Sequence, residues 1–103
     1  MEFKESVNNF GDKIGEAAQL AAEKTKTLAK IGRYKVKIAK LQETIRKDYQ
    51  KLGKVYYKDY VTDEEPDEAE YDPICREISE CYRRISILRD AIEDLKQDIS
   101  GEE

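Results

Sequence analysis

The side chains of this chain that could do chemistry are two cysteines, a run of acidic residues and seven tyrosines, with no histidine beside them. Histidine is the usual general acid–base group and a frequent zinc ligand. The sequence also lacks a glycine-rich phosphate loop and any serine or cysteine beside a base motif. We therefore expect no enzyme, no catalytic residue, no cofactor, no bound metal and no small-molecule substrate.

The two cysteines and the acidic run each have a structural explanation. Cys75 and Cys81 are six positions apart on one expected helix, which turns them to different faces, so we expect reduced thiols. The acidic run lacks the ligand spacing and central glycine of a calcium loop. Carboxylates just before a helix N-terminus favour its dipole, so we expect this run to precede a helix. The run comprises Asp63, Glu64, Glu65, Asp67, Glu68, Glu70 and Asp72.

Four tyrosines gather in one part of the chain: Tyr56, Tyr57, Tyr60 and Tyr71. Tyrosine is enriched at recognition hot spots, so Tyr56, Tyr57 and Tyr60 are candidate interaction residues. The other interpretation is that the cluster plugs the open end of a helical hairpin, with its hydroxyls reaching water. We favour the plug.

A heptad stripe follows the acidic run and predicts the element that must position these groups. Apolar residues alternate in steps of three and four from Tyr71 to Ile99, which indicates a helix packed lengthwise against another helix. The stripe comprises Tyr71, Ile74, Ile78, Cys81, Ile85, Leu88, Ile92, Leu95 and Ile99.

A second stripe runs from Ile31 to Val55, with Asp48 as its one polar member. The two stripes match as an antiparallel hairpin when paired residue numbers add to 133. That register pairs Val55 with Ile78, Leu52 with Cys81, Ile45 with Leu88, Leu41 with Ile92, Ile38 with Leu95 and Tyr34 with Ile99. It also places Lys58 beside Glu77. We expect Ile38, Leu41, Ile45 and Leu52 to pack against Cys81, Leu88, Ile92 and Leu95.

The helix boundaries follow from proline and capping residues. Asp72 is a good N-cap and Pro73 suits a first helical turn, although Pro66 could equally open an earlier turn. We therefore expect a basic helix over 31–60, an acidic linker over 61–72 and an acidic helix over 73–100, stopped by Ser100 and Gly101.

Residues 1–30 form an amphipathic helical segment whose seam comprises Phe3, Val7, Phe10, Ile14, Ala17, Ala21 and Leu28. Its phase differs from that of the next stripe near Gly32, which is a candidate kink. We favour one long helix, kinked or rotated in phase at Gly32; a three-helix bundle, with this segment folded back, is the alternative. Phe3, Val7, Phe10 and Ile14 are candidate interaction residues, because a two-helix hairpin leaves faces for a partner to cover.

Charge and length bound the remaining possibilities. The 103 residues suit one helical domain, 41% of them are charged, and no apolar run approaches a membrane span. We expect a cytoplasmic protein. Residues 1–60 carry 14 Lys/Arg and 8 Asp/Glu, against 5 and 15 in residues 61–103. The basic part, residues 1–58, could meet nucleic acid or a membrane surface, but a solvated face beside an acidic helix is the favoured interpretation.

Three stretches support a resemblance: Phe10-Gly-Asp-Lys-Ile-Gly-Glu-Ala-Ala, Lys51-Leu-Gly-Lys-Val-Tyr-Tyr, and the Ile/Leu heptads after Pro73. Together they resemble small uncharacterised bacterial helical proteins, some of which continue into a C-terminal zinc ribbon. The resemblance implies a coiled-coil module and assigns no activity; this chain has no Cys-x-x-Cys pair, so no zinc role carries over. We expect an all-α coiled-coil hairpin that serves as an oligomerisation or protein-interaction module, as a homodimer or with a protein partner.

Overall fold

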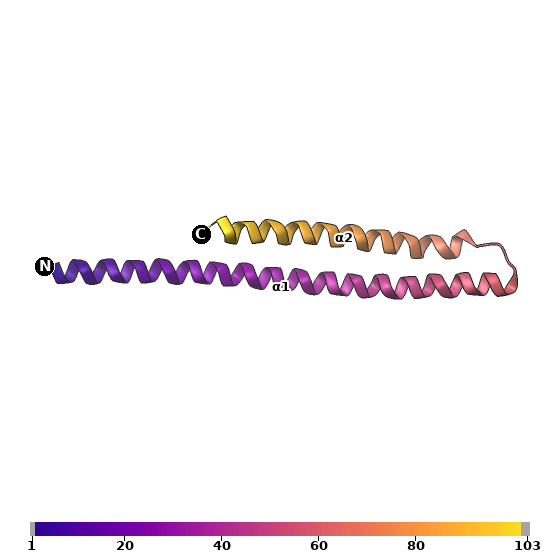
Figure 1. The fold of residues 1–103 in the computed structure, drawn as a ribbon, viewed down its shortest axis with the longest axis horizontal. Helices are drawn as coiled ribbons and strands as arrows, with labels where there is room; N and C mark the ends of the chain where they lie inside the picture. Colours follow the sequence, from indigo (N-terminus) through magenta and orange to yellow (C-terminus); the bar gives the residue numbers. More distant parts are fainter. Residues whose placement is uncertain (1, 102–103) are drawn as a thin grey trace.

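The structure, a computed structural model, describes the backbone of residues 2–101 and the side chains of residues 15–100. Two helices account for nearly all of it: α1 (Glu2–Thr62) and α2 (Glu68–Gly101). They run antiparallel and pack side by side along the length of α2 (Figure 1). The expected all-α helical hairpin is confirmed, and the three-helix bundle is wrong because residues 2–30 continue α1 rather than folding back.

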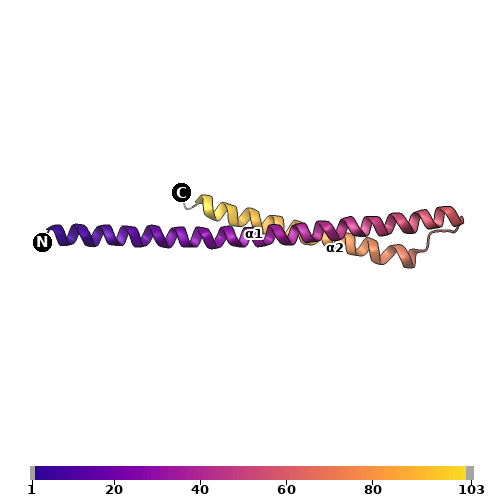
Figure 2. The same ribbon diagram turned by 90° about the horizontal axis from the view of Figure 1, so that it is seen from below.

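The length of α1 sets the shape of the molecule. At about 1.5 Å per residue, its 61 residues account for the long dimension of 93 Å. The helix continues through Gly32 without a break or sharp bend, so the phase shift in the sequence rotates the apolar seam around a continuous helix (Figure 2). With 34 residues, α2 covers only the C-terminal half of α1.

The core is a narrow ribbon between the two helices. Every position of both heptad stripes is buried or half-buried, as the spacing predicts. Of the eight residues expected to form the core, Ile38, Ile45, Cys81 and Ile92 are buried, and the four leucines are half-buried. The buried apolar residues among those described are Ile31, Ile38, Ile45, Ile78, Cys81, Ile85 and Ile92. Such a ribbon leaves the outer faces of both helices in water.

The register between the helices differs from the expected one. Tyr71 reaches Asp59, Tyr82 reaches Tyr49, and Glu70 reaches Lys58, so paired numbers add to 130, 131 and 128 instead of 133. In particular, Lys58 meets Glu70 rather than Glu77. The shift of up to about one helical turn keeps both stripes in the core, which is why the apolar pattern alone could not exclude it.

The turn between the helices is short and capped on both sides. Asp63 adopts φ 53°, and the Glu64 amide donates to the carbonyl of Asp59 at 3.1 Å, which is the Schellman arrangement at a helix C-terminus. After Pro66, Asp67 is the N-cap of α2: its Oδ1 accepts from the Ala69 amide at 3.0 Å.

The expected start of the second helix is therefore five residues late. Glu68 begins α2, Pro73 lies inside the helix, and Asp72 is a helical residue rather than the cap. The residues outside the helices are 63–67, not 61–72. Pro66 opens the earlier turn because Asp67, directly after it, supplies the capping oxygen.

Candidate functional site

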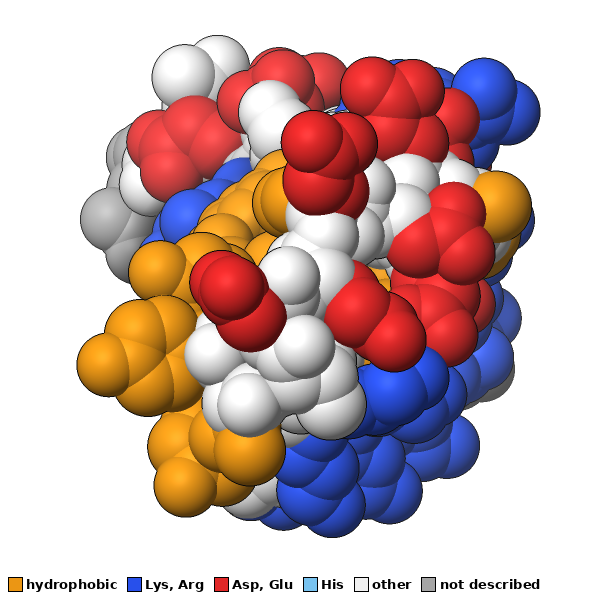
Figure 3. All heavy atoms as spheres, turned by 90° about the vertical axis from the view of Figure 1, so that its right-hand side faces the viewer, with side chains coloured by type: hydrophobic (Ala, Val, Ile, Leu, Met, Phe, Trp, Pro, Cys, Tyr) orange, Lys and Arg blue, Asp and Glu red, His pale blue; other side chains and the backbone are white. Residues whose placement is uncertain are grey.

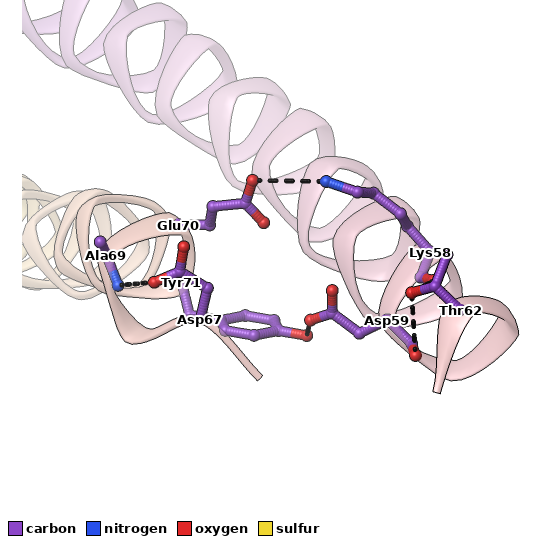
Figure 4. Close-up of polar contacts among 7 residues, drawn as sticks. All are labelled: Lys58, Asp59, Thr62, Asp67, Ala69, Glu70 and Tyr71. Carbon is purple, nitrogen blue, oxygen red and sulfur yellow. Dashed lines mark hydrogen bonds and ion pairs between the residues drawn. The ribbon is translucent and has the colours of Figure 1, made fainter. Parts of the chain in front are cut away.

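One buried carboxylate of α1 joins the two helices at the hairpin tip. Asp59 is 6% exposed, and the Tyr71 hydroxyl donates to its Oδ2 at 2.8 Å across the two helices (Figure 4). Beside it, Lys58 Nζ lies 3.6 Å from Glu70 Oε1, the one ion pair between helices among the described side chains. The hydrogen bond to Asp59 raises the pKa of Tyr71 to about 12. These contacts position the tip but bring no nucleophile and base together.

The other tip tyrosines do not plug the hairpin. Tyr56, Tyr57 and Tyr60 are all exposed, and only Tyr71 packs between the helices. The plug interpretation is wrong for these three because they lie on outward positions of the last turns of α1. Their role as interaction residues stays a prediction.

A second buried acid interrupts the core. Asp48 is 2% exposed, its Oδ2 accepts no hydrogen bond, and its nearest cation, Lys51, lies 3.8 Å from Oδ1. Hydrogen bonding with Asp48, and then the charge of Asp48, raise the pKa of Glu77 on the facing helix. A protonated Glu77 is thus a donor that the Asp48 carboxylate can use. Burial raises the pKa of the Cys81 thiol nearby, so this thiol is not an activated nucleophile.

Two cross-helix contacts distinguish the two sides of the hairpin. The Tyr49 and Tyr82 hydroxyls are 3.4 Å apart on one side, and Lys58 meets Glu70 on the other. Residues seven positions apart lie on the same side of a helix in a coiled coil, so each contact identifies the other residues on its side. Counting back in sevens from Lys58 and from Lys54 gives a row of exposed cations, which we call the basic flank. It comprises Lys26, Lys30, Arg33, Lys37, Lys40, Lys47, Lys51, Lys54 and Lys58.

Charges and apolar groups are segregated around the rod. Seen from the tip, Lys and Arg side chains gather on one side of α1, apolar and tyrosine side chains on its other side, and acidic side chains mostly over α2 (Figure 3). Among the ion pairs of the described side chains, one joins the basic flank to α2, that of Lys58 with Glu70. The ion pairs of Arg46, Lys51, Arg76, Arg83 and Arg84 are all with acids of their own helix.

An open hollow of about 380 Å³ lies midway along the basic flank. Leu41, Ile87 and Leu88 line it with apolar surface, and Lys37, Lys40 and Arg84 complete its lining. Ile87 is 53% exposed although it is a large aliphatic side chain. The heptad pattern missed this site because Ile87 lies outside the stripe of α2.

The N-terminal half of α1 has no helix beside it (Figures 1 and 2). Among its described side chains, the seam residues Ala17, Ala21 and Leu28 are exposed, and none from Gly15 to Lys30 is buried. The candidate residues Phe3, Val7, Phe10 and Ile14 lie on the same helix, but their side chains fall outside the described residues. The described part of the seam, Ala17 to Leu28, thus continues past the end of α2 without a partner in this chain.

Two further observations bear on the chemistry. Within the described part of the chain, no three His, Cys, Asp or Glu side chains are grouped so that they could hold a metal ion. No described helix is sufficiently long and apolar to cross a bilayer. The arrangement offers elongated surfaces for binding rather than an enclosed site for a small molecule.

Comparison with protein-family models, with curated proteins and with solved structures finds no match to this chain. The resemblance to small bacterial helical proteins therefore stays a prediction.

Proposed function

We propose that this protein is a non-catalytic coiled-coil module that dimerises through the N-terminal half of α1. One observation carries the proposal: the apolar seam of α1 extends about 40 Å beyond the end of α2, and its described members are exposed there. An isolated amphipathic helix is marginal in water, so such a seam gains stability from a second helix.

The seam is self-complementary when two copies cross antiparallel. Pairing residues whose numbers add to 31 sets Phe3 against Leu28, Phe10 against Ala21 and Ile14 against Ala17 of a second copy. Each of these three large residues then meets a smaller one, and Val7 meets Lys24, whose alkyl stem can lie along the seam. The same patch serves both copies, as a two-fold interface requires. A parallel pair would set Phe10 against Phe10 and Ala21 against Ala21, with uneven separation.

Light scattering after gel filtration, over a range of concentrations, tests the association. We expect a dimer that dissociates on dilution. Ala17→Glu should shift the chain to monomer, since it places two carboxylates in the seam. Ala22→Glu is the matched control because it adds the same charge to an exposed alanine away from the seam, and it should leave the dimer intact.

Small-angle scattering distinguishes the dimer geometries. An antiparallel overlap of the two seams predicts a longest dimension of about 140 Å, whereas a parallel pair stays near the 93 Å of one chain. A monomer at every concentration, with the helical signal retained, would overturn the self-association and leave a different protein as the occupant of the seam.

A further inference from the structure

We propose that the basic flank binds the surface of an anionic lipid bilayer. All nine of its cations are exposed, and they recur every three or four residues from Lys26 to Lys58 except at Thr44. The row is about 48 Å long, with a cation roughly every 5 Å.

The row lies on one continuous helix, because α1 runs through this region without a break. Positions seven residues apart drift about 20° around a straight helix, so the row winds slowly, as the two helices do around each other (Figure 2), and a flat surface meets its central part most closely. Mobile anionic lipids can gather under it, and each Lys or Arg near such a surface strengthens binding about fivefold.

The hollow on the flank also favours a lipid surface. Lys37, Lys40 and Arg84 stand around the apolar floor that Leu41, Ile87 and Leu88 form. Cations beside an exposed aliphatic side chain match the interfacial zone of a bilayer, where head groups lie above acyl chains. Phosphodiester backbones present no apolar surface to Ile87. Single-stranded nucleic acid is bound through successive aromatic side chains. Along the flank, Tyr57 lies beside Lys54 and Lys58, and the half-buried Tyr34 lies beside Lys30 and Lys37, so these two rings are far apart in the row rather than successive.

Acids of α2 offset some of the flank cations near the tip. Toward the tip, Lys58 pairs with Glu70. The charge of Lys51 lowers the pKa of Glu77, which opposes the larger effect of Asp48 on Glu77. At the hollow, Arg84 of α2 lies next to Lys37 and Lys40, with Glu80 of its own helix 3.2 Å away. The protein carries a net charge of −4, so attraction to an anionic surface must come from this local segregation.

Flotation with lipid vesicles tests the proposal on the full chain. We expect the protein to float with vesicles of phosphatidylcholine and phosphatidylserine at low salt, to dissociate at high salt, and to stay unbound with phosphatidylcholine alone. The triple variant Arg33→Gln, Lys40→Gln, Lys47→Gln should weaken the partition on the order of 100-fold.

The matched control removes three cations from the opposite side. Lys35 is two heptads before Tyr49 on α1. Arg89 and Lys96 are one heptad and two heptads after Tyr82 on α2. All three therefore lie on the side of the hairpin where Tyr49 meets Tyr82. Lys35→Gln, Arg89→Gln, Lys96→Gln gives the same net charge and should change the partition only a few-fold. Ile87→Gln should weaken binding while leaving every charge in place. Circular dichroism verifies that each variant is folded.

Three results would overturn the proposal: equal losses in the two triple variants, no binding of the folded wild type to anionic vesicles, or binding of a DNA or RNA duplex that vesicles fail to displace. The vesicle proposal and the dimer proposal can fail separately. Ala17→Glu changes the seam of residues 1–30 and keeps every cation of the basic flank, so vesicle binding can be measured without the dimer.

Discussion

The hydroxyl of Tyr71 donates a 2.8 Å hydrogen bond to Oδ2 of Asp59, joining the first turn of α2 to the last turn of α1. Asp59 is the next member of the α1 stripe after Val55, so a polar pair ends the apolar ribbon at the hairpin tip. An unpaired carboxylate would be unfavourable at this depth, which makes the two residues dependent on each other.

Removing the Tyr71 hydroxyl should loosen the tip. We expect Tyr71→Phe to lower the melting temperature and to speed amide exchange of residues near the turn, because Asp59 then remains buried without its donor. Tyr57→Phe removes a hydroxyl from an exposed ring and serves as the control. Equal melting temperatures for the two variants would contradict a stabilising role of this hydrogen bond.

The same pair predicts an alkaline transition. Because the pKa of Tyr71 is raised to about 12 from 10, its contribution to stability is complete below pH 10 and is lost as pH rises through about 12. An ultraviolet titration should show one tyrosine that ionises last. In Tyr71→Phe that late step should be missing; its persistence would assign it to another tyrosine.

The heptad stripe of α2 supplies four of the seven buried apolar residues of the core. Ile85 is 4% exposed, so Ile85→Ala should cost about 2–5 kcal/mol of unfolding free energy and Ile85→Asp should unfold the hairpin. Ile87→Ala, two positions along the same helix, should change stability by about 0.5 kcal/mol or less. Thermal melting followed by circular dichroism measures both. Unchanged melting of Ile85→Asp would contradict the stripe as core.

Asp48 should be a destabilising member of the core. Its Oδ2 accepts no hydrogen bond, so Asp48→Leu should raise the unfolding free energy by about 1–3 kcal/mol, as measured by urea denaturation. Asp94→Leu, at an exposed position, should have little effect. A loss of stability in Asp48→Leu would show that the carboxylate is paired more favourably than its surroundings indicate.

The Asp48–Glu77 pair also predicts a pH dependence. The raised pKa of Glu77 means that its contribution to stability is complete below its ordinary pKa and is lost as pH rises through the raised value. Glu80 acts oppositely: Arg83 lowers its pKa to about 2, so its contribution is lost as pH falls from 4.5 toward 2. Glu77→Gln should therefore remove the fall in melting temperature between mildly acidic and neutral pH. The loss of stability at more acidic pH, which Glu80 causes, should remain. An unchanged profile would rule out the pair as its cause.

The start of α2 should depend on Asp67 rather than on Asp72. Replacing the capping oxygen in Asp67→Ala should cost about 0.5–2 kcal/mol, since the Ala69 amide loses its acceptor. Asp72→Ala removes an exposed carboxylate inside the helix and an ion pair with Arg76, and should cost less. The reverse order of melting temperatures would place the cap at Asp72.

Heptad spacing by itself determined the helical class of this protein and the two faces that meet, and the acidic, proline-containing linker between the stripes added the antiparallel hairpin. A period of 3.5 residues indicates a helix packed along its length, and every predicted stripe position is buried or half-buried. The continuity of α1 was also predictable, since the residues around Gly32 contain no strong helix breaker. Asp48 was visible as the polar member of its stripe.

Only the tertiary structure decided the register, the start of α2 and the surfaces left uncovered. Sliding one heptad stripe along another by up to a helical turn still buries apolar residues, so particular pairs such as Asp59 with Tyr71 had to select the register. Asp67 and Asp72 are equally good N-cap residues by sequence, and the position of the turn makes Asp67 the N-cap of α2. The basic flank with its hollow depends on residues from both helices, which no single stripe contains.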